Sequence, residues 1–454
     1  MKRIHFIAIG GSAMHNLAIA LHLKGYNVTG SDDEIFEPSK SRLQKYNLLP
    51  DTIGWNPDKI TTNHDAVILG MHARQDNPEL IRAQELDIKI YSYPEYLYEQ
   101  SKDKLRVVIG GSHGKTTITA MIIHVLNKLN IPTDYMVGAQ LQGFDVMVKL
   151  SEKAHIMILE GDEYLTSPID RRPKFHLYKP NIGLINGIAW DHINVFPTFD
   201  NYVEQFRIFA NMIADGGVLL YNNTDEIAHE VALNTQRKIK VEGYGIPPYE
   251  INNEMTFIIH NGIKYPLHIF GKHNLTNLYG AWKVCRELNI TDEDFLNAIS
   301  TFTGASKRLE LVDKSDTTAI YKDFAHSPSK LKATITAVKE QYPNRILTAC
   351  LELHTFSSLN KKFLSEYKDC MNLADEACVY FNPATIEHKK LEAITIAEVK
   401  QAFGRDDLTV FNSSPELVSK LHATDWGNHN LLLMSSGNFD GIIFDQLAKE
   451  ILKK

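Results

Sequence analysis

Residues 105–117 read LRVVIGGSHGKTT, and this stretch decides the predicted fold. A short apolar run of strand type leads into a loop of small residues, and apolar residues then recur at helical spacing to about Leu129. A helix that begins in such a loop offers free backbone N–H groups and the positive end of its dipole to phosphate. We therefore predict a strand, a nucleotide-binding loop and a helix.

Within this loop, Lys115 is the candidate contact of the β- and γ-phosphates, and Thr116 is the candidate hydroxyl ligand of Mg²⁺. A strict Walker A pattern places glycine at position 109, where this chain has Ile109. The alternative is a plain helix start with a surface lysine, but the strand and helix context favours nucleotide binding. The predicted ATP-binding loop comprises Gly111, Ser112, His113, Gly114, Lys115, Thr116 and Thr117.

Acidic residues follow the next predicted strand. Glu160 ends the run HIMILE and is followed by Gly161-Asp162-Glu163, at the sheet edge where sites in open α/β sheets collect. Three acids in four residues favour metal or phosphate chemistry over an exposed acidic turn. Asp191-His192 follows the strand NIGLIN in the same way, although a lone histidine is usually structural.

Strands alternate with helical stretches along the whole chain, which predicts an α/β fold with parallel sheets. At roughly 150 residues per domain, 454 residues correspond to about three domains. Asn261-Gly262 predicts a hairpin turn, and a helix is expected from Asn360. We place the three blocks at residues 1–102, 103–305 and 306–454.

The first block has a second loop of interest, Gly10-Gly11, with Asp32 placed 22 residues later. This spacing is compatible with a dinucleotide-binding unit and hence with a nicotinamide oxidoreductase. The third glycine of that fingerprint is absent, however, because Ala13 and Met14 occupy the region. Phosphate binding of another nucleotide explains the loop equally well.

Composition excludes several classes. Lys and Arg number 48 against 55 Asp and Glu, a net charge of -7 without long basic runs, so we expect no nucleic-acid partner. No apolar run approaches the ~18 residues of a membrane helix, and a signal peptide is not indicated, so we expect a cytoplasmic protein without membrane insertion. Cysteines occur without C-x-x-C spacing and are expected to be reduced core thiols: Cys285, Cys350, Cys370 and Cys378.

Several motifs occur in one order along the chain: IAIGGSAMHNLA, GSHGKTT, EGDEY, NGIAWDHINVF, GKHNLTNLYGA, KRLEL, KDFAHSP and SSGNFDG. In this order they resemble the Mur ligase family over essentially the whole chain. The resemblance implies a Rossmann-like N-terminal domain that binds a UDP-sugar, a central P-loop ATPase domain and a Rossmann-like C-terminal domain that binds the acceptor. It also implies an ATP-dependent, ADP-forming amide ligase that works through an acyl phosphate.

Within the family, the stretch DRRPKF at 170–175 is similar to the branch that joins UDP-N-acetylmuramate to L-alanyl-γ-D-glutamyl-meso-diaminopimelate in peptidoglycan recycling. The alternative is the branch that adds L-alanine in peptidoglycan biosynthesis. The implied partners are ATP, UDP-N-acetylmuramate and a short muropeptide, and the chain is expected to be a monomer or weak homodimer. A further alternative is a nucleotide-sensing scaffold that binds without turnover.

The resemblance also implies roles for single residues. Lys115, Glu160 and His192 are implied as catalytic residues, with magnesium held by Thr116, Glu160 and His192. The implied contacts outside the phosphate loop are His273, Asn274 and Asn277 at the adenine, Arg308 at the phosphates, Asp323 at the ribose, Gly10, Gly11 and Asp32 at the UDP, His72 and Arg74 near the sugar, and His326 at the acceptor.

Three departures from the family concern the acceptor and the lysine chemistry. Several Mur ligases have a carbamylated lysine after the Asp-His segment, but no lysine lies between Lys179 and Lys238 here. Where relatives have two consecutive histidines, this chain has His326-Ser327. Where relatives place arginines for the acceptor carboxylate, it has residues 353–357, LHTFS. The identity of the acceptor therefore stays open at this point.

Overall fold

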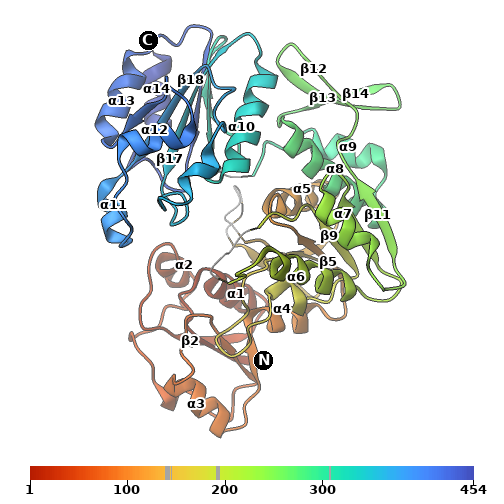
Figure 1. The fold of residues 1–454 in the computed structure, drawn as a ribbon. Helices are drawn as coiled ribbons and strands as arrows, with labels where there is room; N and C mark the ends of the chain where they lie inside the picture. Colours follow the sequence, from red (N-terminus) through yellow and green to blue (C-terminus); the bar gives the residue numbers. More distant parts are fainter. Residues whose placement is uncertain (139–143, 145, 191–194, 306–307, 454) are drawn as a thin grey trace. The chain divides into compact units, whose positions relative to one another are not determined.

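The computed structural model of the chain describes residues 1–138, 144, 146–190, 195–305 and 308–453. These residues form two compact units, Met1–Ile246 with Thr276–Ile299 and Pro247–Leu275 with Ser300–Lys454. Figure 1 shows mainly parallel sheets flanked by helices in both units. The predicted α/β fold class is confirmed.

The N-terminal sheet is fully parallel and has the strand order β2-β1-β3-β4. Its central strand β1 is apolar and buried over residues 4–7, as expected for a strand covered by helices on both faces. The elements are β1 (Arg3–Ile7), α1 (Ser12–Leu23), β2 (Asn27–Ser31), α2 (Ser39–Lys45), the 3-10 turn η1 (Pro57–Lys59), β3 (Ala66–Leu69), α3 (Pro78–Glu85), β4 (Ile90–Ser92) and α4 (Tyr93–Ser101).

The central sheet has the order β11-β10-β9-β5-β8-β6-β7, with only the short edge strand β7 antiparallel among its described strands. Strand β5 lies in the middle, which places the loop after it between the ends of two neighbouring strands. The elements are β5 (Leu105–Gly110), α5 (Lys115–Lys128), β6 (Thr133–Met136), β7 (Val148–Lys149), β8 (Ile156–Glu160), η2 (Lys174–Leu177), β9 (Ile182–Ile185), α6 (Phe199–Asn211), β10 (Val218–Asn222), α7 (Glu226–Leu233), β11 (Lys240–Tyr244), α8 (Lys272–Glu287) and α9 (Asp292–Ile299).

A small antiparallel sheet follows, with strands β12 (Tyr249–Asn252), β13 (Met255–His260) and β14 (Ile263–Leu267). Asn261 and Gly262 connect β13 to β14 and both have positive φ, at 50° and 77°. A two-residue hairpin loop needs this backbone because it matches the twist of the two strands. The predicted hairpin turn is confirmed.

The C-terminal sheet has the order β15-β16-β20-β17-β18-β19, and its side chains alternate between two apolar clusters. In β17, Ala349 and Leu351 pack with helices α10 and α12, whereas Cys350 packs with α13 and α14. The elements are β15 (Glu310–Lys314), β16 (Ala319–Asp323), α10 (Pro328–Gln341), β17 (Ile346–Leu353), η3 (Leu364–Tyr367), β18 (Glu376–Phe381), α11 (Pro383–His388), α12 (Ile396–Phe403), β19 (Thr409–Phe411), α13 (Ser414–Ala423), β20 (His429–Met434) and α14 (Phe444–Leu452).

The prediction of a helix from Asn360 is wrong. The Asn360 side chain accepts a hydrogen bond from the Lys362 backbone N–H at 3.0 Å, which forms an Asx turn in place of a first helical turn. Only the 3-10 segment η3 follows, over Leu364–Tyr367. Apolar residues at helical spacing here belong to turns that pack on the sheet, so periodicity alone was misleading.

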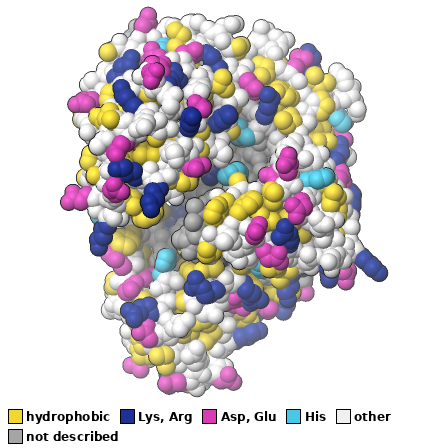
Figure 2. Space-filling view, viewed as in Figure 1, with side chains coloured by type: hydrophobic (Ala, Val, Ile, Leu, Met, Phe, Trp, Pro, Cys, Tyr) yellow, Lys and Arg dark blue, Asp and Glu magenta, His cyan; other side chains and the backbone are white. Residues whose placement is uncertain are grey.

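Three further observations concern the surface and the core. No helix among the described residues is long and apolar enough to cross a membrane. The four cysteines are free and buried. On the face shown in Figure 2, Lys and Arg side chains are interspersed with Asp and Glu side chains, in keeping with 48 basic and 55 acidic residues in the chain.

Candidate functional site

The loop between β5 and α5 has a backbone that requires glycine. Gly111 has φ 127° and Gly114 has φ 80°, both in the region that L side chains rarely adopt. A Cβ on Gly114 would also collide with the side chains of Asn186 and Asn277. Helix α5 begins immediately afterwards, at Lys115, so its first N–H groups face the loop.

Strand register explains which residues meet this loop. In β5, Ile109 is the partner of Glu160 in β8, and Gly110 is the partner of Ile185 in β9. All three strands are parallel, so their carboxyl ends lie at one edge of the sheet. The phosphate loop, Glu160 and Asn186 are therefore brought together although 75 positions separate Gly111, the first loop residue, from Asn186.

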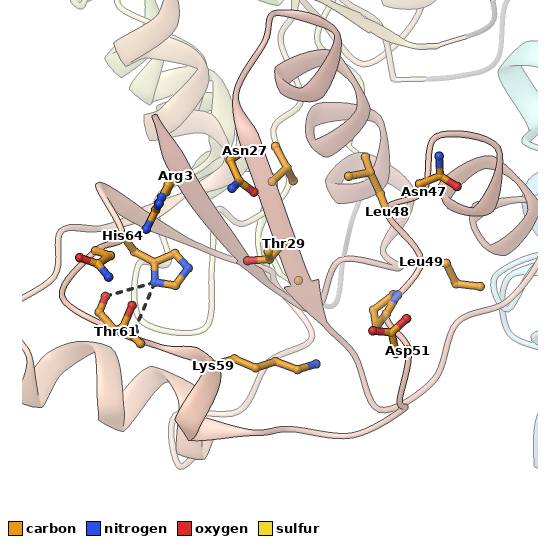
Figure 3. Close-up of a pocket in the computed structure, with 14 residues that line it drawn as sticks. Arg3, Asn27, Thr29, Asn47, Leu48, Leu49, Asp51, Lys59, Thr61 and His64 are labelled. Carbon is orange, nitrogen blue, oxygen red and sulfur yellow. Dashed lines mark hydrogen bonds between the residues drawn. The ribbon is translucent and has the colours of Figure 1, made fainter. Parts of the chain in front are cut away.

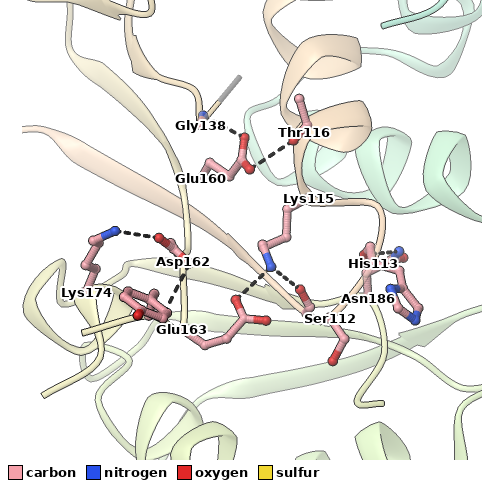
Figure 4. Close-up of polar contacts among 12 residues, drawn as sticks. Ser112, His113, Lys115, Thr116, Gly138, Glu160, Asp162, Glu163, Lys174 and Asn186 are labelled. Atoms are coloured by element: carbon pink, nitrogen blue, oxygen red, sulfur yellow. Dashed lines mark hydrogen bonds and ion pairs between the residues drawn. The ribbon is translucent and has the colours of Figure 1, made fainter. Parts of the chain in front are cut away.

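Thr116 and Glu160 form the first pair at this edge (Figure 4). The Thr116 hydroxyl donates to Glu160 Oε1 at 2.9 Å, and the Gly138 backbone N–H donates to Glu160 Oε2 at 2.9 Å. Burial raises the pKa of the Glu160 carboxyl, although the Gly138 N–H and the charge of Lys115 oppose this rise. Thr116 and Glu160, which are both predicted magnesium ligands, therefore lie within hydrogen-bond distance of each other.

Lys115 is held within the loop by an acid that follows β8. Its Nζ donates to Gly111 O and to Glu163 Oε2, each at 2.7 Å (Figure 4). Burial alone would lower the pKa of Lys115, but the charges of Glu163 and Asp162 outweigh it and raise that pKa. Asp162 in turn accepts from Lys174 at 2.6 Å. A buried cation is thus kept charged at the helix N-terminus.

Asn277 reaches the same loop through Asn186. The Asn186 Nδ2 group donates to Asn277 Oδ1 at 2.8 Å and to His113 O at 3.0 Å. The Tyr244 hydroxyl donates to Asn186 Oδ1 at 2.7 Å, so the amide of Asn186 is fixed on both sides. Asn277, for which the sequence predicts a contact with the adenine, therefore lies beside the phosphate loop.

The second unit contains the remaining predicted ATP residues. Burial raises the pKa of Asp323, which accepts from the backbone N–H groups of Leu309 and Ala325, while the charge of Arg308 opposes that rise. The Arg308 guanidinium lies 5.1 Å from the centre of the Phe324 ring.

Three more predicted residues of this unit make local contacts. Asn274 Nδ2 donates to Phe270 O at 3.0 Å. Burial lowers the pKa of His273 to about 4, so its imidazole is neutral at neutral pH. His326 Nδ1 lies 2.8 Å from Phe324 O. Asp191 and His192 lie outside the described residues.

The first loop is built differently. The Gly10 backbone N–H donates to Asp32 Oδ2 at 2.6 Å, and burial raises the pKa of that carboxyl. Gly10 and Asp32 therefore meet at the carboxyl ends of β1 and β2, with Gly11 next in the chain. His72 is exposed, and Arg74 pairs with Asp76 at 3.0 Å with 83% of its side chain exposed.

A pocket of about 450 Å³ lies elsewhere in this domain (Figure 3). It follows the first half of β2 and the start of β1, and its lining includes Arg3, Asn27, Thr29, Lys59 and His64. None of the predicted UDP-sugar residues lines it. The cavity and the predicted nucleotide-sugar loop are thus separate features of one domain.

The donor set near the phosphate loop suits magnesium. No group of three or more His, Cys, Asp and Glu side chains among the described residues is arranged to hold a metal. Thr116 and Glu160 nevertheless supply adjacent hard oxygen donors, and Mg²⁺ in such sites takes one or two carboxylates and completes its shell with water and phosphate. These two residues would hold the ion, which would neutralise charge on the phosphates.

Comparisons with known proteins identify the family. The Mur ligase family catalytic domain matches residues 3–104, the Mur ligase middle domain matches 109–285 and the Mur ligase glutamate ligase domain matches 307–437. A UDP-N-acetylmuramate–L-alanine ligase of Caldicellulosiruptor bescii is 32% identical over 395 residues, covering 84% of this chain and 83% of the relative. The chain belongs to the Mur ligase family.

Three further proteins are similar over nearly the full length of this chain. A UDP-N-acetylmuramate–L-alanyl-γ-D-glutamyl-meso-2,6-diaminoheptandioate ligase of Haemophilus influenzae is 27% identical over 98% of this chain and 99% of its own. The structure of a murein peptide ligase from Psychrobacter arcticus has a TM-score of 0.64 at 20% identity, over 100% of this chain and 98% of the other. That of a Thermotoga maritima UDP-N-acetylmuramate–alanine ligase has a TM-score of 0.70 at 19% identity, over 100% and 99%.

Mur ligases are ADP-forming ligases of the peptidoglycan pathway that use ATP and substrates of the UDP-N-acetylmuramate type. This chain is therefore an ATP-dependent ligase of cell-wall synthesis, as predicted. The family matches fall into three regions, and the three-domain Mur ligase architecture is confirmed. The domain boundaries after residues 102 and 305, and the roles of the single site residues, stay predictions.

Sequence reasoning missed three residues that hold the loop: Glu163, Asn186 and Tyr202. Glu163 lay within the acidic triad, but nothing in the spacing singled it out as the partner of Lys115. Asn186 ends a predicted strand, a position that could have marked it. Tyr202 is 90 positions from Ser112 and lies in a helix of ordinary amphipathic pattern, so no local signal exists.

Proposed function

We propose that this Mur ligase joins the carboxylate of UDP-N-acetylmuramate to the amine of L-alanyl-γ-D-glutamyl-meso-diaminopimelate. The observation that carries a phosphoryl-transfer site is the pairing of Lys115 with Glu163 beside the Thr116–Glu160 pair. The tripeptide acceptor is supported by similarity to the Haemophilus influenzae tripeptide ligase over nearly both whole chains.

The segment after Glu163 supports the same acceptor. Leu165 and Pro173 form an antiparallel bridge, and Arg172 pairs with Asp170 through two nitrogens, so DRRPKF belongs to a closed loop. Gln75 Nε2 donates to Pro168 O at 3.2 Å and joins this loop to the segment that carries His72 and Arg74. We propose that the loop helps to shape the site for the sugar and the incoming peptide.

The proposed reaction needs no protein nucleophile. The muramate carboxylate attacks the γ-phosphate and releases ADP, and the peptide amine then displaces phosphate from the acyl phosphate. Lys115 would neutralise charge on the transferring phosphate, while Thr116, Glu160 and His192 would hold Mg²⁺. Positioning and charge neutralisation then account for most of the rate.

The remaining predicted contacts are proposed for the substrates. Gly10, Gly11, Asp32, His72 and Arg74 are assigned to the UDP-sugar. The residues proposed for ATP outside the loop are His273, Asn274, Asn277, Arg308 and Asp323, and His326 is proposed for the acceptor.

A second candidate acceptor is L-alanine. The relative of Caldicellulosiruptor bescii, at 32% identity, is named for that reaction. The two acceptors share the amine that attacks the acyl phosphate and differ in length, so the same ATP chemistry serves either one.

Acceptor choice is measured directly by phosphate release from ATP with UDP-N-acetylmuramate and Mg²⁺, comparing L-alanine with the tripeptide. Turnover with the tripeptide alone supports the proposal. Turnover with L-alanine alone replaces it by the second candidate. Absence of turnover with both acceptors, in a protein that binds the UDP-sugar, contradicts both.

A further inference from the structure

A chain of four contacts joins the phosphate loop to helix α6. The Ala189 backbone N–H donates to Ser112 Oγ at 2.9 Å, and Ser112 Oγ lies 2.9 Å from the Tyr202 hydroxyl. The Tyr202 hydroxyl donates to Glu163 Oε1 at 2.7 Å, and Glu163 Oε2 accepts from Lys115 Nζ at 2.7 Å. One phenol hydroxyl thus connects two residues of the loop.

The direction of every bond in this chain is determined. Both oxygens of Glu163 accept, so the single proton of Tyr202 is used on Glu163. In the contact between the two hydroxyls, Ser112 must then be the donor and Tyr202 the acceptor. Ser112 Oγ still has lone pairs, and one of them accepts the Ala189 N–H. If Tyr202 donated to Ser112 instead, Glu163 Oε1 would lose its donor.

Burial makes this chain strong and rigid. Tyr202 is 0% exposed and Glu163 is 1% exposed, so water does not compete for their hydrogen bonds. The Tyr202 ring packs between Phe196 and Phe206, with ring centres 5.4 Å and 5.3 Å away. Apolar packing therefore places the hydroxyl independently of the loop.

We propose that Tyr202 is a positioning residue of the phosphate loop, which holds Glu163 against Lys115 and holds Ser112 against the segment after β9. Through Glu163 it sets where the Lys115 ammonium lies, and through Ser112 it sets the distance from the loop to Ala189. This inference rests on the proposed role of Lys115 at the phosphates of ATP. Tyr202 itself touches no substrate in this proposal.

The test removes one hydroxyl and uses a matched control. Tyr202→Phe keeps the ring packing and deletes the donor to Glu163. Tyr178→Phe makes the same change at a tyrosine that directly follows η2 and is also 0% exposed. The Tyr178 hydroxyl has no hydrogen-bond partner among the described residues. Steady-state kinetics are measured for ATP and for UDP-N-acetylmuramate in both variants and in the wild type.

We expect kcat/KM for ATP to fall about tenfold in Tyr202→Phe, because a buried hydrogen bond to a charged group is lost. KM for UDP-N-acetylmuramate should stay unchanged, and Tyr178→Phe should match the wild type. Equal losses for both substrates, or wild-type kinetics in Tyr202→Phe, would overturn the proposal.

A double variant tests whether Tyr202 acts through Glu163. Glu163→Gln cannot accept hydrogen bonds from Tyr202 and Lys115 on separate oxygens, because one end of its amide is an NH₂ donor. If the positioning is transmitted by Glu163, adding Tyr202→Phe to Glu163→Gln should change kcat/KM for ATP by less than about twofold. Full additivity of the two losses would overturn the proposed route.

Two further measurements separate this inference from the proposed function. Calorimetric titration with a non-hydrolysable ATP analogue is compared between the wild type and Lys115→Met. Equal affinity would contradict the role of Lys115 at the phosphates, whatever Tyr202 does. If Tyr202→Phe does not fold, Ser112→Ala breaks the chain one bond away, and a selective loss for ATP is expected there; wild-type kinetics for ATP would overturn the proposal.

Discussion

The loops after β1 and β5 are alike locally but carry opposite charge. Each follows the end of a buried parallel strand, contains two adjacent glycines and leads into a helix. After β1, the Gly10 N–H is occupied by the acidic side chain of Asp32. After β5, the loop contains the cation Lys115, which is paired with Glu163.

This difference shows that a glycine pair does not by itself define the ligand of a loop. The first loop offers hydrogen-bond groups, and a neutral histidine supports it: Gly11 O lies 2.9 Å from His15 Nδ1, which therefore carries the ring proton. The second loop offers a charged group whose counter-ion can be exchanged for phosphate. In the proposed function, the nucleotide sugar would be held intact at the first loop and ATP would react at the second.

The largest expected effect is on kcat and follows from removing the positive charge of the second loop. Lys115→Met should lower kcat for ADP formation by about 10³-fold, because one preorganised cation at the developing charge is lost. Lys240→Met serves as the matched control, since Lys240 pairs with Glu287 at 2.6 Å and belongs to none of the proposed site residues. ADP release is measured under saturating substrates. Similar losses of kcat in both variants would contradict a specific role of the Lys115 charge in phosphoryl transfer.

The next largest effect compares one glycine from each loop. Gly114→Ala puts a Cβ at φ 80° and into Asn186 and Asn277, so we expect a loss of about 1–3 kcal/mol in the free energy of unfolding. Gly11→Ala meets its nearest atom at 3.4 Å with φ -57°, so its change should stay below about 1 kcal/mol. Urea unfolding measures both. Equal destabilisation would contradict the difference in backbone between the loops.

A smaller effect concerns magnesium at the second loop. Thr116→Val removes the hydroxyl that contacts Glu160, and we expect the Mg²⁺ concentration for half-maximal rate to rise about tenfold. Thr116→Ser retains the hydroxyl and should behave as the wild type. The Mg²⁺ dependence of ADP formation measures both variants, and an unchanged requirement in Thr116→Val would remove Thr116 from the metal site.

The smallest expected effect is a pH dependence of the free energy of unfolding, which arises from His15 beside the first loop. Burial lowers the pKa of His15 below its ordinary value of 6.5, so below that pH the unfolded chain takes up the proton first and the folded state loses stability. His15→Gln lacks this contribution, and its stability deficit relative to the wild type should shrink between pH 7.5 and 5.5. Urea unfolding at the two pH values measures the difference. A deficit that grows on acidification would mean that His15 is stabilised by its proton.

Part of the site was predictable because its residues lie in short contiguous motifs. Lys115, Thr116 and their glycines lie in one motif, and Glu160 ends a recognisable strand, so parallel-sheet geometry already predicts that they share an edge. The counter-ion of Lys115 was harder to predict from the sequence, because two acids follow β8 and their spacing does not distinguish Glu163 from Asp162. Asn360 shows the opposite failure, since an Asx turn competed with the helix that periodicity indicated.

The sequence by itself determined the α/β class, the two glycine loops and the family, because strand and helix patterns and contiguous motifs are local properties of the chain. Only the tertiary structure decided that Asp32 occupies the first loop, that Glu163 holds the cation of the second and that Tyr202 orders both Glu163 and Ser112. The physical reason is distance along the chain: the Tyr202 and Ser112 hydroxyls are 90 positions apart and meet only because sheet register and aromatic packing place them at 2.9 Å.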